Sequence, residues 1–185
     1  MDAIEAIHTR TSGGKMQARP VERHLIEQLL DAGAQAPNHY KVRPWRFVVL
    51  TGAARERLGD LMADIFQQRF PDLPADALQK ERHKPLRAPL IIAVGVDAPS
   101  EPKVRAEENM CAAAAACENI LLAAHAIGLS GHWRTGEAAR DPRVKSFLGL
   151  PPDQPLIAFL YIGYAEAEVP PAARPRYTER TTWME

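Results

Sequence analysis

Residues 104–127 read VRAEENMCAAAAACENILLAAHAI and predict the longest helix of the chain. The centre of this run, Ala112 to Ala116, is apolar on every face, which is typical of a helix that is buried all round. Its small side chains also allow another backbone to approach closely. A central helix within one chain and a helix–helix seam between two chains both agree with this pattern.

Four short apolar runs predict β-strands. The run Leu90–Val94 (LIIAV) has no polar residue, so we expect a strand that is buried on both faces. Similar runs at 46–50 and 156–164 predict two more buried strands, and a less regular strand is expected at about 128–134.

The other periodic segments predict helices. Asp2 and Glu5 have the spacing of a capping box, which indicates a short helix at the start of the chain. Further helices are expected from Pro20 onward, across the apolar positions of 58–66 and around 75–83.

The order of these elements favours an α+β fold. It runs helix-helix-strand-helix-helix-strand-helix-strand-strand, without the regular alternation of a doubly wound α/β sheet. A chain of 185 residues has the length of one domain and can bury a core without disulfides. We therefore predict one α+β domain that spans residues 1–185.

Composition and charge exclude several classes of protein. The 23 basic and 23 acidic residues cancel, so no overall field attracts the chain to nucleic acid or to an anionic membrane. The longest apolar stretch is interrupted by Glu118 and Asn119 and is shorter than a bilayer span. The start of the chain carries no apolar signal segment. We expect a soluble, cytoplasmic protein.

The two cysteines predict neither a disulfide nor a metal site. If Cys111 and Cys117 share one helix, the helical rise alone separates their Cα atoms by ~9 Å, which is too far for a bond. The chain has no CxxC pair and no partners at zinc-ligand spacing. We expect no bound metal.

Three polar clusters at the ends of elements are candidates for ligand binding. Arg10, Thr11 and Ser12 follow the first helix and could grip a phosphate with charged groups, hydroxyls and loop amides. Alternatively, Arg10 offsets the helix dipole and Ser12 only makes a turn. The segment Ala36–Trp45 (APNHYKVRPW) could present its polar groups to a planar ring, or could be a simple connection to the next strand.

The third cluster is Gly128–Gly136 (GLSGHWRTG). Its glycines permit close approach of the backbone to a ligand, and His132, Arg134 and Thr135 could meet a phosphate or a ring edge. An irregular edge strand with a bulge would explain the same residues. No catalytic dyad or triad emerges, and no dinucleotide or nucleotide loop is present. His125, inside the long helix, is expected to be a packing residue.

Taken in order along the chain, these clusters resemble the nitroreductase family, and in particular its short YdjA-type subgroup. The resemblance rests on the start MDAIEAI…RTS, on APNH…RPWRF and on GHWRTG, and it covers essentially the whole chain. It implies a nitroreductase-like α+β fold, with a central mixed sheet of four or five strands flanked by helices. It also implies an intertwined homodimer with FMN at the subunit interface.

The resemblance further implies specific contacts to FMN. Arg10, Thr11 and Ser12 would hold the phosphate and ribityl end, and Trp133, Arg134 and Thr135 match a later FMN segment. Gln35 and His39 match a segment that the other subunit supplies, and the chain from Val169 onward would reach over that subunit.

The implied activity is transfer of a hydride from NAD(P)H through flavin N5 to a small organic acceptor, such as a nitroaromatic or a quinone. Because FMN carries the redox chemistry, the protein needs no catalytic acid–base pair of its own. A cation near the N1/O2 edge would stabilise the reduced flavin, and His39, Lys41 and Arg43 are candidates. The resemblance is incomplete, because larger members of the family have Arg and Lys in the first motif where this chain has Thr11 and Gly14, and Arg43 replaces the Gln that usually precedes the Pro-Trp pair.

Other functions remain compatible with the same residues. The same fold and flavin could serve ene reduction, reductive dehalogenation or flavin fragmentation. A non-enzymatic flavin-binding module would bind FMN that NAD(P)H does not reduce. The arginines at 174, 176 and 180 could contact nucleic acid, although the zero net charge argues against this.

Overall fold

A computed structural model describes residues 1–170, 173–174 and 176–185 of the chain. The helices, 3-10 helices (η) and strands are α1 (Ala3–Thr9), α2 (Arg23–Ala34), η1 (His39–Lys41), β1 (Trp45–Leu50), α3 (Ala53–Arg69), α4 (Ala75–His83), η2 (Lys84–Arg87), β2 (Leu90–Val96), α5 (Ala106–Ala126), β3 (Ser130–Arg134), η3 (Glu137–Arg140), α6 (Pro142–Phe147), β4 (Leu156–Gly163) and η4 (Tyr177–Arg180). Every helix and strand predicted from the sequence is present. The expected α+β fold is confirmed.

The four strands form one sheet in the order β1-β2-β4-β3. All three strand pairs are antiparallel, so the described strands do not form the mixed sheet that we expected. Helices α3 and α4, followed by η2, connect β1 to β2, and η3 and α6 connect β3 to β4; each connection begins and ends at the same end of the sheet. The next strand therefore runs the opposite way, whereas a single crossover helix would make it parallel.

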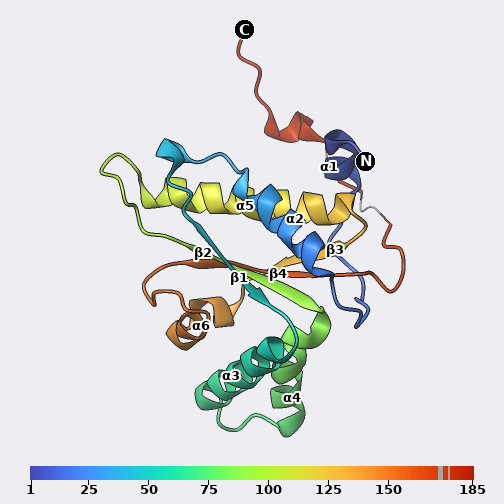
Figure 1. Cartoon of the computed structure of the whole chain (residues 1–185), viewed down its shortest axis with the longest axis vertical. Coiled ribbons are helices and arrows are strands. Elements are labelled where there is room, and N and C mark those ends of the chain that lie inside the picture. Colours follow the sequence, from blue (N-terminus) through green and yellow to red (C-terminus); the bar gives the residue numbers. More distant parts are fainter. Residues whose placement is uncertain (171–172, 175) are drawn as a thin grey trace.

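Helices cover both faces of the sheet, with α2 and α5 on one face and α3, α4 and α6 on the other (Figure 1). The apolar strand β2 lies in the middle and is buried along its whole length. Ile92 and Val94 pack on the side of α2 and α5, and Ile91 and Ala93 pack on the opposite side. This alternation explains why the sequence of β2 has no polar face.

The long helix α5 is less buried than its sequence predicts. Ala112, Ala113 and Ala116 are buried, but Ala114 and Ala115 are only partly covered. Cys111 is exposed, as is Met110 with 37% of its surface accessible. The prediction of burial all round is therefore wrong for a single chain. The remaining alternative, a seam between two chains, agrees with this half-open face.

Helix α6, which lies between β3 and β4, was not predicted from the sequence. Its six residues are too few to show a 3.6-residue period, and only Val144 is buried. The sequence does carry a helix-start signal at Asp141 and Pro142. In the structure the Asp141 carboxylate accepts a hydrogen bond from the Arg143 N–H, and Pro142 occupies the first turn. Asp141 thus has a structural role at the start of α6.

The C-terminal segment 176–185 leaves the body of the molecule beside α1 (Figure 1). Tyr177, Trp183 and Met184 expose 66%, 76% and 94% of their surfaces. Before this segment, the Arg174 guanidinium donates hydrogen bonds to the carbonyl oxygens of Ile7 and Arg10. Arg174 is therefore held at the end of α1 rather than free in solvent.

Candidate functional site

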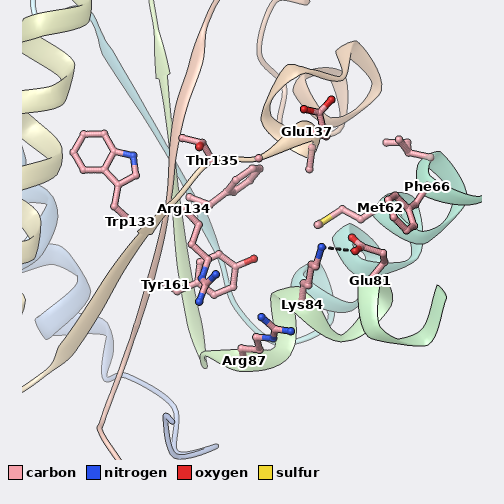
Figure 2. Close-up of a pocket in the computed structure, with 14 residues that line it drawn as sticks. Met62, Phe66, Glu81, Lys84, Arg87, Trp133, Arg134, Thr135, Glu137 and Tyr161 are labelled. Carbon is pink, nitrogen blue, oxygen red and sulfur yellow. Dashed lines mark hydrogen bonds and ion pairs between the residues drawn. The ribbon is translucent and has the colours of Figure 1, made fainter. Parts of the chain in front are cut away.

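A pocket of about 430 Å³ lies where the end of β3 faces helices α3 and α4 (Figure 2). Its apolar residues are Met62, Ile65, Phe66, Ala138 and Phe159, and its other lining residues are Glu81, Lys84, Arg87, Trp133, Arg134, Thr135, Gly136, Glu137 and Tyr161. An apolar cavity with a few converging polar groups is the usual form of a small-molecule site.

Strand register brings the sheet residues of the pocket together. Arg134 on β3 pairs with Phe159 on β4, and Tyr161 follows Phe159 by two residues. Paired residues and residues two apart point to the same face of a sheet, so all three face α3 and α4. Trp133 points the other way, toward α5 (Figure 2), and lines a second, shallower hollow with Met110.

Close packing of α3 and α4 positions the opposite wall. Gly59 on α3 lies so near α4 that a Cβ atom there would come within 2.1 Å of the Arg82 carbonyl oxygen. This approach places Met62 and Phe66 of α3 beside Glu81 of α4. The pocket is thus built from segments that are far apart in the sequence.

Positive charge predominates among the groups in the pocket. Lys84 is paired with Glu81, and the Glu137 carboxylate is paired with Arg69 at 2.6 Å, whereas Arg87 and Arg134 make no ion pair among the described residues. Burial, together with the nearby Arg134, lowers the pKa of His132. Burial also raises the pKa of Tyr161 to about 12, so its phenol stays protonated at neutral pH.

The structure brings together two of the three predicted segments along strand β3. Trp133, Arg134 and Thr135 lie at the end of β3 beside the pocket. The loop of Arg10, Thr11 and Ser12 lies near the start of β3, because the Ser130 hydroxyl donates a hydrogen bond to the Gly13 carbonyl oxygen at 3.2 Å. A five-residue strand separates the two segments by about 13 Å, given the rise per residue.

The loop that begins at Arg10 offers several groups to an anion. The Arg10 Nη1 atom donates to the Ser12 hydroxyl at 3.1 Å, and Nε lies 3.5 Å from the Glu118 carboxylate without forming a hydrogen bond. In the described structure, the backbone N–H groups of residues 11–14 have no hydrogen-bond acceptor. A guanidinium, a hydroxyl and free amides fit a phosphate group.

The second predicted segment lies away from the pocket of its own chain. Gln35 follows α2 and donates a weak hydrogen bond to the Asp31 carbonyl oxygen, and His39 stands in the exposed η1. Tyr40, Lys41 and Arg43 have positive φ values of 51°, 55° and 49°. Left-handed conformations of such residues are strained, and this kind of strain gathers at functional sites.

The sequence analysis missed five polar residues of the pocket, of which Glu137 directly follows the third predicted cluster. Glu81, Lys84 and Arg87 belong to the charged segment before β2, which resembled an ordinary solvated helix end. Tyr161 lies within an apolar strand and resembled a core residue. The only signal was the position of Lys84 and Arg87 around Pro85, directly before a buried strand.

No catalytic dyad is apparent among the described residues. His125 Nε2 forms a hydrogen bond with the Thr9 hydroxyl at 2.8 Å, which confirms it as a packing residue. In the same part of the chain, no three His, Cys, Asp or Glu side chains are placed to hold a metal ion. Of the helices that the structure describes, none combines the length and apolarity needed to cross a membrane.

Comparison with known proteins connects this fold to one family. A model described as "Nitroreductase family" matches residues 7–164. The "Putative NAD(P)H nitroreductase YdjA" of Escherichia coli (strain K12) is 32% identical over 165 residues, which cover 88% of each chain. The fold is similar to that of the nitroreductase-like family protein of Bacillus cereus, with a TM-score of 0.86 and 25% identity over 100% of this chain and 97% of the other.

A protein of Desulfovibrio desulfuricans that was crystallised in complex with FMN is also similar. Its TM-score is 0.77 and its identity 25%, over 100% of this chain and 98% of the other. The match to the family model covers most of the chain, and the resemblance of its three polar segments agrees with that match. The chain belongs to the nitroreductase family.

Proposed function

We propose that the protein is an FMN-dependent oxidoreductase that transfers a hydride from NADH or NADPH to a small organic acceptor, such as a nitroaromatic or a quinone. The pocket at the end of β3 carries this proposal, because Trp133, Arg134 and Thr135 border it. The name of the E. coli relative and the FMN complex of the D. desulfuricans protein support it.

The residues of the chain would bind FMN at two ends. Arg10 and Ser12, with the free amides of residues 11–14, are suited to the phosphate. Trp133, Arg134 and Thr135 lie about 13 Å farther along β3, a distance that suits the ring system of the same molecule. The apolar residues Met62 and Phe66 would exclude water from that ring.

When bound, FMN supplies the redox chemistry by accepting a hydride at N5 and passing it on. The residues of the pocket would then only bind the flavin, orient it and adjust its reduction potential. Lys84, Arg87 and Arg134 are the cations that line the pocket, and His39, Lys41 and Arg43 of the same chain do not line it. Lys84, Arg87 and Arg134 are therefore further candidates for the cation that would stabilise a reduced flavin in the pocket of their own chain.

We further propose a homodimer in which Gln35 and His39 of one subunit complete the pocket of the other. Their distance from their own pocket, the strained loop beside them and the half-open face of α5 support this arrangement. The exposed Trp183 and Met184 in the C-terminal segment provide apolar surface for such a contact.

The visible spectrum of the purified protein tests the function. We expect a flavin band that disappears on anaerobic addition of NADPH or NADH and returns with a nitroaromatic acceptor. A band that both nicotinamides leave unchanged would favour a flavin-binding module without this activity. A colourless protein that takes up no added FMN would refute the proposal.

A further inference from the structure

Arg87 and Arg134 differ from the other charged groups of the pocket. Among the described residues, neither guanidinium group makes an ion pair or a hydrogen bond. Lys84 has Glu81 as its partner, and Glu137 is held by Arg69 and Arg140. The pocket therefore contains two guanidinium groups whose charge is not compensated by an acid.

Both guanidinium groups lie close to Tyr161. The Arg134 Cζ atom is 5.9 Å from the centre of the Tyr161 ring. Arg87 and Arg134 each favour ionisation of the phenol, but burial outweighs them and keeps its pKa near 12. The tyrosine is only 6% exposed, and Figure 2 shows its hydroxyl pointing into the pocket. This hydroxyl is a hydrogen-bond donor at neutral pH and has no partner among the described residues.

The backbone holds these groups in place. Arg87 is the last residue of η2 and lies between the buried Pro85 and the buried Ala88. The carbonyl oxygen of Ala88 accepts a hydrogen bond from the Arg55 guanidinium at 2.5 Å. Tyr161 lies between Ile91 and His132 in the register of the sheet. The donors therefore come from three rigid elements, and little ordering is needed when a ligand binds.

We propose that Arg87, Arg134 and the Tyr161 hydroxyl form an oxyanion-binding site, and that the pocket takes an aromatic or heteroaromatic compound bearing a phosphate or carboxylate group. Guanidinium groups bind both kinds of oxyanion through charge-assisted hydrogen bonds. The side chains of Phe66, Phe159 and Met62 provide the apolar wall for the ring.

Two sources could supply this oxyanion. One is the phosphate of FMN; this source rests on the proposed binding of FMN, and it would place the phosphate here instead of at the loop of Arg10 and Ser12. The other is a carboxylate on the electron acceptor, which the pocket would bind whether or not FMN is present. Both sources share the chemistry of the site, so each is tested with a pair of probes of which only one carries the oxyanion.

The test uses the variants Arg87→Gln and Tyr161→Phe of the full chain, with Arg57→Gln as the control. Arg57 is an exposed arginine on α3 that does not line the pocket, so its loss changes the net charge equally. Calorimetry measures the affinity of flavin-stripped protein for FMN and for riboflavin, which lacks the phosphate. The same measurement compares 4-nitrobenzoate with the uncharged 4-nitrobenzamide.

Two ratios of affinity are compared, FMN over riboflavin and 4-nitrobenzoate over 4-nitrobenzamide. We expect Arg87→Gln to reduce one of these two preferences by about ten- to hundredfold, because a hydrogen bond to a charged group is lost. Tyr161→Phe should reduce the same preference less, and Arg57→Gln should leave both unchanged. A smaller preference for FMN over riboflavin would assign the site to the cofactor. A smaller preference for 4-nitrobenzoate would assign it to the acceptor.

Failure of this inference is distinguishable from failure of the proposed function. If the wild-type protein binds FMN and NAD(P)H reduces it, but both preferences are the same in all variants, the oxyanion site is refuted and the function stands. If the wild-type protein binds no flavin, the proposed function fails. The nitrobenzoate comparison then still decides whether the oxyanion site exists.

Discussion

Arg10 links the first helix to the loop for which we propose phosphate binding. Its guanidinium already holds the Ser12 hydroxyl and lies against Glu118 of α5, and its side chain is only 16% exposed. Its place in the fold is thus fixed before any ligand binds. Arg174 adds to this by binding the carbonyl oxygen of Arg10 itself.

We expect Arg10→Ala to weaken FMN affinity by about ten- to hundredfold, because it removes a charge-assisted contact to the phosphate. Fluorescence titration with FMN measures the affinity, and circular dichroism checks that the fold is unchanged. Arg57→Ala, on the exposed face of α3, should have no effect. If Arg10→Ala binds FMN as tightly as the wild type, the proposal that this loop binds the phosphate is contradicted.

Glu22 makes the stability of the protein depend on acidity. Its carboxylate accepts hydrogen bonds from the Tyr164 hydroxyl at 2.5 Å and from Arg19 at 2.7 Å. These contacts, above all the one from Tyr164, lower the pKa of Glu22 from 4.5 to about 2. Because the unfolded chain binds this proton more readily, the stabilisation is present above pH 4.5 and is lost as the pH falls toward 2.

The variant Glu22→Gln should therefore lower the melting temperature clearly at pH 7 and much less at pH 2. Thermal denaturation followed by circular dichroism at both values measures the difference. Glu27→Gln provides the control, because the one ion-pair partner of Glu27 in the described parts of the chain is the exposed Arg23 on the surface of α2. A loss of the same size at both pH values would contradict the coupling to Tyr164.

At the scale of elements, the contact between α3 and α4 forms one wall of the pocket. It depends on Gly59, where a Cβ atom would meet the Arg82 carbonyl oxygen at 2.1 Å. A backbone atom of a packed helix cannot move aside as the end of a flexible side chain can. The two helices must therefore separate if any larger residue takes this position.

We expect Gly59→Ala to destabilise the protein by about 1–3 kcal/mol, the usual cost of overpacking. Urea denaturation measures this loss, and Gln67→Ala on the exposed side of α3 serves as the control. Because Met62 and Phe66 follow Gly59 on the same helix, ligand affinity in the pocket should also decrease. A variant as stable as the control would mean that α3 and α4 can separate without cost.

At the scale of the whole molecule, a single chain leaves one face of α5 partly exposed and its C-terminal segment, residues 176–185, extended from the body. We expect sedimentation velocity at micromolar protein to give a species of twice the chain mass of 20.5 kDa. Deletion of residues 176–185 should weaken this association, because it removes the exposed Tyr177, Trp183 and Met184. A wild-type species of 20.5 kDa would refute the dimer, and with it the contribution of Gln35 and His39 from a partner.

The sequence determined the local elements and the segments that border the site. The charged helix predicted around 75–83 is α4, Leu90–Val94 is the core of β2, and Trp133–Thr135 reach the pocket. These features depend on the period of apolar residues, on caps and on turn residues, which act over a few positions of the chain. Such features can be predicted from the sequence because they do not depend on tertiary contacts.

Only the tertiary structure decided the antiparallel order of the strands, the open face of α5 and the meeting of Arg87, Tyr161 and Arg134. These three residues belong to η2, β4 and β3, and no spacing along the chain indicates that they converge. Burial and unpaired charge are properties of contacts between distant segments. They arise when packing fixes the neighbours of each side chain, and the same arginine could otherwise be an ordinary solvated residue.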